Sequence, residues 1–213
     1  MKIIMFSDKY GLTQAVLELR KKNTRRQEKS LDNAIEKYEE TYKTPFSIIS
    51  QYYDSGLERL VLRTPDEAIY IKPRYLPGEV VAVAQKYSDI MPYLADSFHQ
   101  PSIDYMKNKP GYNNKLFVRA DLMPHQIRVT DIRVERIQDI SNEDCLREGI
   151  YLDKTAPPCC RPFYTFQGSQ ECGTLVGYHT AREAYEGLIT QLSSKITWDD
   201  NPYVFVYTFE LVK

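Results

Sequence analysis

The sequence predicts an α+β fold: a small, mostly antiparallel β-barrel with flanking helices and an inserted helical segment. Two observations lead to this prediction. Short strand-like runs recur from the first residues to the last, and helices with recognisable caps lie between them without repeated βαβ units. The length of 213 residues suits one domain with insertions. We therefore expect a single domain over residues 1–213, with insertions at about 27–70 and 88–114.

The N-terminal part predicts a strand followed by two helices. "KIIMFS" is the strand, and Thr13 is the expected N-cap of the first helix. The inward face of this helix is expected to hold Leu12, Val16, Leu17 and Leu19. "SLDNAIEKYEETYK" then repeats apolar residues at helical spacing, which predicts an amphipathic helix at the start of the first insertion.

The second half predicts further strands and two capped helices. "PGEVVAVAQKY" is a turn followed by an apolar strand, and the three prolines of residues 88–114 predict a long loop that borders a site. "KLFVRAD" and "HQIRVTDIRVERIQDI" alternate as strands do, and a slip of the apolar phase at Asp131 predicts a bulge. Helices are expected after Ser141, up to Gly149, and after Thr180, where Glu183 is the reciprocal partner. "NPYVFVYTFELV" is the last strand.

The composition excludes several classes of protein. With 42% hydrophobic and 27% charged residues the chain is neither disordered nor embedded in a membrane. No apolar run approaches ~20 residues, and the N-terminus lacks the features of a signal peptide, so we expect a cytoplasmic protein without a membrane partner. The four cysteines are then expected to be reduced thiols.

Motifs for metals and cofactors are absent. No phosphate-binding glycine loop or zinc-protease motif occurs. Cys159, Cys160 and Cys172, with His179 further on, have a poor spacing for tetrahedral zinc. The sequence therefore predicts neither a metal site nor a cofactor.

Positive charge is concentrated in one short stretch. The net charge of the chain is −1, yet six cations and one acid, Glu28, lie between residues 20 and 29. The six are Arg20, Lys21, Lys22, Arg25, Arg26 and Lys29. Such a cluster fits a site for phosphate or another anion, and it is also typical of solvated charge at a helix end.

The same stretch resembles a known signature. "LRKKNTRR" is similar to the G-x-K-x-x-[ET]-x-R signature of ASCH domains, which are PUA-like barrels: Lys21, Thr24 and Arg26 match, and Leu19 stands where the signature has glycine at a tight helix-to-strand turn. The resemblance to a bacterial and phage subgroup continues through "IKPRYLPGEVVAVAQKY", the segment from "KLFVRAD" to "LREGI", and the segment from "TAREAYEGL" to "FELV". These blocks cover roughly half to two thirds of the chain.

The resemblance implies a cleft that accepts RNA, a nucleotide or a modified nucleoside. One branch of the family, the small bacterial N4-acetylcytidine amidohydrolases, uses a lysine, a threonine and a glutamate that correspond to Lys21, Thr24 and Glu148. Those enzymes are far shorter than this chain.

The residues themselves are compatible with such chemistry. Amide cleavage needs a nucleophile, a base and positive charge for the oxyanion. Thr24 supplies a hydroxyl, and Lys21 is a base if burial and neighbouring cations lower its pKa. Glu148 would orient the lysine or relay a proton to the leaving amine. If Glu148 instead holds Lys21 charged, the lysine is a donor to phosphate or carbonyl oxygen.

Three interpretations without catalysis stay open. In the first, the cleft binds its ligand through the cations Arg20, Lys22, Arg25 and Arg26, while Tyr75 or Tyr87 stacks on a base. In the second, Thr24 satisfies helix carbonyls and Lys21 with Glu148 is a structural ion pair. In the third, the tyrosine-rich insertion binds another protein.

Overall fold

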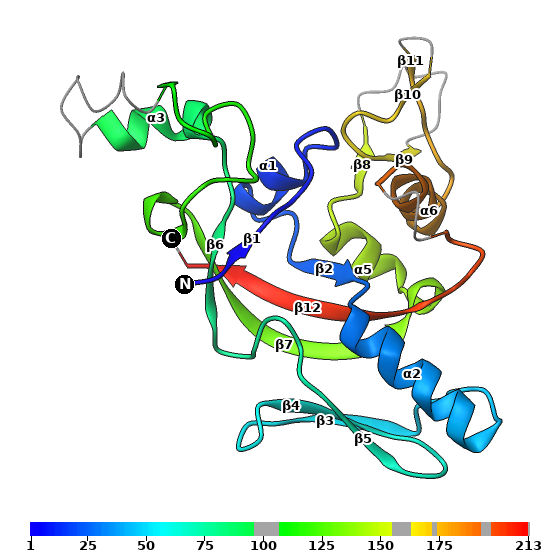
Figure 1. The fold of residues 1–213 in the computed structure, drawn as a ribbon. Coiled ribbons are helices and arrows are strands. Elements are labelled where there is room, and N and C mark those ends of the chain that lie inside the picture. Colours follow the sequence, from blue (N-terminus) through cyan, green and yellow to red (C-terminus); the bar gives the residue numbers. More distant parts are fainter. Residues whose placement is uncertain (96–106, 155–162, 172–173, 193–196, 213) are drawn as a thin grey trace.

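The computed structural model describes residues 1–95, 107–154, 163–171, 174–192 and 197–212. Its helices are α1 (Leu12–Leu17), α2 (Lys29–Tyr42), α3 (Tyr87–Ala95), α5 (Asn142–Arg147) and α6 (Ala181–Leu192), with 3-10 turns η1 (Ala120–Leu122) and η2 (Ile137–Asp139). Its strands are β1 (Ile3–Ile4), β2 (Asn23–Arg26), β3 (Ser50–Asp54), β4 (Arg59–Arg63), β5 (Ala68–Ile71), β6 (Val80–Val83), β7 (Gln126–Arg136), β8 (Tyr151–Asp153), β9 (Phe163–Thr165), β10 (Gln170–Glu171), β11 (Thr174–Leu175) and β12 (Tyr203–Leu211). The predicted α+β class is confirmed (Figure 1).

A five-stranded sheet forms the centre of the molecule. Its strand order is β1-β6-β7-β12-β2, with β1 parallel to β6 and the other pairs antiparallel. In the described residues β1 and β2 are the two ends of this order, so the sheet does not close into a ring. The two residues of β1 pair with β6 alone, and the chain leaves β1 for α1 before it reaches β2.

The long pair of β7 and β12 holds the core. β12 is buried along most of its length because its side chains pack on both faces of the sheet, with Phe205 and Tyr207 at 0% exposure. Asp131 pairs with Thr208 and Val129 with Phe209, so Thr130 has no partner of its own. This is the bulge that the phase slip predicts, and it bends the strand at that point.

The first insertion is only partly helical. α2 is the predicted amphipathic helix, with Leu31 and Tyr38 buried, but β3, β4 and β5 follow it as a second, antiparallel sheet. The strand pattern of β3, β4 and β5 is weak because few of their residues belong to the main core: Leu60 and Leu62 of the central strand β4, and Ile71 of β5, are its fully buried members there.

Two predicted elements are wrong. The expected loop 88–114 begins as helix α3, which contains Pro92; its residues 96–106 lie outside the described part. "KLFVRAD" is no strand and instead ends in the turn η1, although its alternation is strand-like.

The caps of α5 and α6 are as predicted, and that of α1 is not. The Ser141 hydroxyl accepts from the Asp144 amide, and the Thr180 hydroxyl accepts from the Glu183 amide. In α1, however, the N-cap is Gly11 in a left-handed conformation, and the Thr13 hydroxyl donates to the Phe6 carbonyl instead. Within the described ranges, every helix is too short or too polar to cross a membrane.

Candidate functional site

The candidate site begins at the turn between α1 and β2. Leu19 adopts φ 61°, a left-handed conformation that normally favours glycine, and its side chain is exposed rather than packed inward as predicted. The amide of Lys21 donates to the Ala15 carbonyl at 2.9 Å and closes the turn. The chain therefore makes a tight turn between α1 and β2, with a leucine in the left-handed position.

The turn leads the basic cluster into β2, where successive side chains point in opposite directions. Asn23 and Arg25 reach the carboxylate of Asp144 on α5, whereas the Arg26 guanidinium donates to the carbonyl of Met5 beyond β1. Thr24 shares the orientation of Arg26 because both are even positions of the strand. The cluster that is continuous in the sequence is thus divided between two faces.

Arg25 is a buried hub of ion pairs. Its guanidinium contacts Glu135 at 2.5 Å, Glu148 at 2.9 Å and Asp144 at 3.0 Å. Burial alone would lower the pKa of Arg25, but Glu148 and Glu135 raise it above its usual value, so the residue stays charged. With its charge met by three carboxylates, Arg25 is not available to a phosphate, and its prediction as a ligand-binding residue is wrong.

Lys21 and Glu148 form the pair that the resemblance implies. The Lys21 Nζ donates to Glu148 Oε2 at 2.5 Å and to the Glu148 carbonyl at 2.9 Å, and the two residues are 3% and 4% exposed. Burial is the main cause that lowers the pKa of Lys21, and Arg26 and Arg25 lower it further, while Glu148 acts in the opposite direction. The balance favours the neutral amine more than in water.

Two polar groups on the other face of β2 make no hydrogen bond in the part of the chain that the structure describes. The Thr24 side chain is 6% exposed, and within the described residues its hydroxyl makes no hydrogen bond. The Arg26 Nε is buried and also has no partner. The Phe6 ring centroid is 5.7 Å from both the Lys21 amine and the Arg26 guanidinium, so one aromatic ring connects the lysine to the other face of β2.

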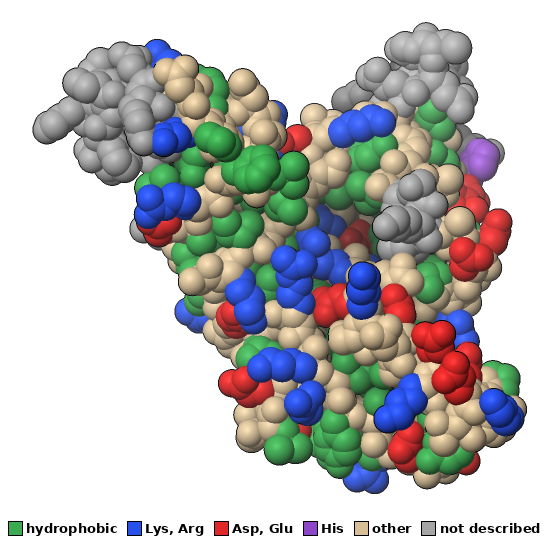
Figure 2. All heavy atoms as spheres, viewed as in Figure 1, with side chains coloured by type: hydrophobic (Ala, Val, Ile, Leu, Met, Phe, Trp, Pro, Cys, Tyr) green, Lys and Arg blue, Asp and Glu red, His purple; other side chains and the backbone are tan. Residues whose placement is uncertain are grey.

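The molecular surface is hollowed in this region. Figure 2 shows a hollow over β2, between the part that holds α1 and the part that holds α5 and α6, with Lys and Arg side chains along its lower edge. Arg20 and Lys22 are exposed, but the Arg20 guanidinium is bound to Glu18 at 2.5 Å and lies 5.8 Å from the Tyr151 ring centroid. Lys22 therefore has the more available charge of the two.

Neither tyrosine that was predicted to stack on a base can do so. Tyr75 is 1% exposed, donates to the Ile3 carbonyl and packs edge-on against Tyr207. Tyr87 lies in α3 within a second apolar cluster, where its hydroxyl accepts from the Arg119 amide. Both rings are core residues, so these two predictions are wrong.

The structure adds three residues that the sequence did not single out. Glu135 and Asp144 are the partners of Arg25, and the buried hydroxyl of Tyr185 on α6 lacks a hydrogen bond while its ring centroid is 5.9 Å from the Arg25 guanidinium. Burial raises the pKa of Tyr185 well above its ordinary value, so the hydroxyl stays protonated. The sequence held a signal for one of the three, Asp144. It precedes Glu148 by one helical turn, so the two carboxylates are expected on the same face of the helix.

The cysteine predictions can be followed at one position. Cys145 is a free and buried thiol whose pKa is raised to about 12, mainly by burial. Cys159, Cys160 and Cys172 lie outside the described residues. Among the described residues no three His, Cys, Asp or Glu side chains are grouped as metal ligands would be.

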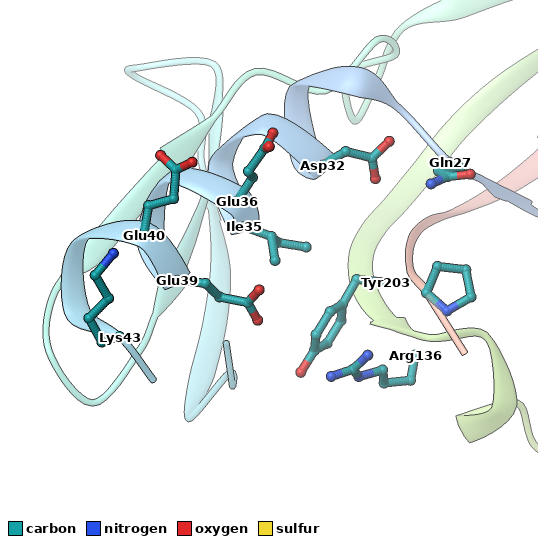
Figure 3. Close-up of a pocket in the computed structure, with 10 residues that line it drawn as sticks. Gln27, Asp32, Ile35, Glu36, Glu39, Glu40, Lys43, Arg136 and Tyr203 are labelled. Carbon is teal, nitrogen blue, oxygen red and sulfur yellow. The ribbon is translucent and has the colours of Figure 1, made fainter. Parts of the chain in front are cut away.

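Other cavities lie away from Lys21. A groove of about 720 Å³ runs between α2 and the start of β12, and Figure 3 shows the acids Asp32, Glu36, Glu39 and Glu40 along its helical wall opposite Arg136 and Tyr203. This wall would repel a phosphate, so the larger volume does not make it the better nucleotide site. A pocket of about 470 Å³ lies between α1 and α3 and includes His125, whose Nδ1 is 2.7 Å from Gln85 Oε1.

Comparison of the chain with protein-family models, with curated proteins and with solved structures found no significant match.

Proposed function

We propose that this chain is an ASCH-type, PUA-like protein that binds a nucleoside or nucleotide-like ligand in the hollow over β2. The observation that carries the proposal is one face of β2, where the buried Arg26 Nε has no hydrogen-bond partner and, among the described residues, the Thr24 hydroxyl makes no hydrogen bond either. Buried polar groups without partners cost stability, and a ligand that completes their hydrogen bonds recovers it. In this proposal the open five-stranded sheet corresponds to the barrel of the family.

The charges favour a small ligand over a long RNA at this site. Two of the six clustered cations, Lys21 and Arg25, are buried and paired with carboxylates, and Arg20 is paired with Glu18. Few positive charges are left to contact a phosphate backbone, and neither Tyr75 nor Tyr87 is accessible to a base. The ligand is therefore expected to be recognised by hydrogen bonds to a base or sugar more than by its phosphates.

The direct test is calorimetric titration with cytidine, N4-acetylcytidine and cytidine monophosphate. We expect binding of at least one of them, weakened about tenfold by Thr24→Val, which removes the hydroxyl at constant volume. Thr24→Ser, which keeps the hydroxyl, is the matched control. Equal affinity in the wild type and Thr24→Val, or no binding of any of the three, would contradict the proposal.

A second candidate function, amide hydrolysis of an acylated base, is favoured by the contact of Lys21 with Glu148. In the proposed reaction the Thr24 oxygen adds to the acyl carbonyl as Lys21 takes its proton, the amine leaves with a proton returned through Lys21 and Glu148, and water then releases the acid from Thr24. Burying the charges of Lys21 and Glu148 costs desolvation free energy, so stability alone does not explain why the pair is buried. A role of the pair in the reaction would explain it, which supports this candidate.

Release of cytidine from N4-acetylcytidine, followed by chromatography, tests the second candidate. Thr24→Val and Lys21→Met are both expected to abolish release while Thr24→Ser retains part of it, and circular dichroism checks that the variants are folded. The pH profile of the rate separates the two roles of Lys21. As a base, Lys21 acts when it is deprotonated, so the rate rises as the pH rises through its lowered pKa. As a charged donor, Lys21 acts when it is protonated, so the rate falls as the pH rises through that pKa. Binding without release would leave the first proposal intact and reject the second.

A further inference from the structure

The outer face of the β3–β4–β5 sheet carries two exposed tyrosines in one row. Tyr52 of β3 and Tyr70 of β5 are both paired with Val61 of the central strand, and they are 45% and 50% exposed. Val61 itself is 1% exposed although it belongs to this outer face, so its neighbours cover it. The two tyrosines are two strands apart, about 10 Å, on a regular antiparallel frame.

Cations flank this row on the same face. Arg59 and Arg63 lie two residues before and after Val61, so they point in the same direction and are exposed. The Arg63 guanidinium is 6.0 Å from the centroid of the Tyr52 ring, and its cross-strand neighbours are the small residues Ser50 and Ala68. The Arg63 end of the row is therefore open to an anionic ligand.

The other end of the row is less positive. Arg59 has Asp54 as its direct neighbour on β3, and the Asp54 carboxylate accepts from the amides of Gly56 and Leu57. Lys72 is 3.6 Å from Glu58, and both side chains are more than half exposed, so this ion pair is weak and a phosphate can compete for the lysine.

We propose that this face, here called the tyrosine platform (Tyr52, Arg59, Val61, Arg63 and Tyr70), binds single-stranded RNA. Exposed rings on a sheet offer flat surfaces on which bases stack, and arginines beside them contact the phosphates of the same strand. A protein partner would need an apolar centre to bury. The only branched aliphatic side chain in the row is Val61, which is already covered, so the exposed chemistry fits bases and phosphates better.

The tyrosine platform is independent of the candidate site at Lys21. Figure 1 shows the β3–β4–β5 sheet on the opposite side of β7 and β12 from α1 and α5, with one face turned away from the rest of the molecule. RNA binding at this face therefore needs neither Thr24 nor the hydrolysis of an acylated base.

The test is fluorescence anisotropy with a labelled single-stranded oligouridylate of twelve nucleotides. The double variant Tyr52→Ala/Tyr70→Ala is expected to weaken binding at least tenfold, because the stacking of each base on an aromatic ring is worth several-fold or more. Tyr93→Ala, which removes a similarly exposed tyrosine of α3, is the matched control and should not change the affinity.

Salt dependence supplies the second readout. Arg59→Gln/Arg63→Gln should reduce the slope of log affinity against log salt by about 1.4, because each cation that neutralises a phosphate of a single strand contributes about 0.7 to that slope. A wild-type protein that does not bind the oligonucleotide at low salt would overturn the proposal. So would tyrosine variants that bind as well as the wild type, or a loss of binding in Thr24→Val, which would move the RNA to the hollow.

Discussion

Two regions of this chain are rich in arginine, and they use it in opposite ways. In the site beside β2, Arg25 is buried and contacts three carboxylates, whereas on the tyrosine platform Arg63 is exposed and has no carboxylate within ion-pair distance among the described residues. The stretch of the sequence with the higher charge density thus exposes less of that charge. A basic run predicts a basic surface only where the structure leaves the cations unpaired.

The largest expected effect is on the free energy of unfolding, when the buried and the exposed arginine are each replaced by methionine. Arg25→Met would leave Glu135, Asp144 and Glu148 in a buried site without their common partner, and we expect a loss of about 3–5 kcal/mol in the free energy of unfolding. Arg63→Met on the tyrosine platform should change it by less than about 0.5 kcal/mol. Urea unfolding followed by circular dichroism measures both. Similar losses for the two variants would show that Arg25 is not a structural hub.

A smaller effect is expected on the pH dependence of stability, through the carboxylate of Asp144. Burial raises the pKa of Asp144, but its contacts with Arg25 and Arg133 outweigh burial and hold the pKa below the ordinary value. A carboxylate whose pKa is lowered by folding stabilises the protein above its ordinary pKa of about 3.9, and that contribution is lost as the pH falls through the lower value. The urea midpoint should therefore fall on acidification from pH 5 to pH 2, and less steeply in Asp144→Asn. An identical slope in the variant would contradict this assignment.

The sequence predicted the elements whose signals are local. The caps at Ser141 and Thr180 and the bulge beside Asp131 are determined by a few neighbouring residues, and all three are present. The sequence also placed Lys21 and Glu148 in one site through the family resemblance, and they are hydrogen-bonded.

The failures have a common physical cause in contacts between distant segments. Tyr75 and Tyr87 have the same side chain as Tyr52 and Tyr70, and only tertiary packing decides that the first two are buried and the last two exposed. Arg25 likewise needs carboxylates more than 100 residues away, which no spacing within the basic run could indicate. Burial and long-range pairing thus decide which of these side chains are exposed to a ligand, more than residue type does.

The smallest expected effect compares two strained turns, one from each region. Leu19 before β2 and Glu58 in the turn between β3 and β4 have φ values of 61° and 51°, and a left-handed conformation costs roughly 1–2 kcal/mol for a residue with a side chain. Glycine removes that cost but loses more entropy on folding, so Leu19→Gly and Glu58→Gly should each stabilise the protein by about 0.5–1 kcal/mol. The exposed contact of Glu58 with Lys72 subtracts little. Urea midpoints measure both variants. If Leu19→Gly alone were neutral or destabilising, the exposed leucine would have a stabilising contact that offsets its strain, and the turn beside Lys21 would differ from the turn of the tyrosine platform in more than position.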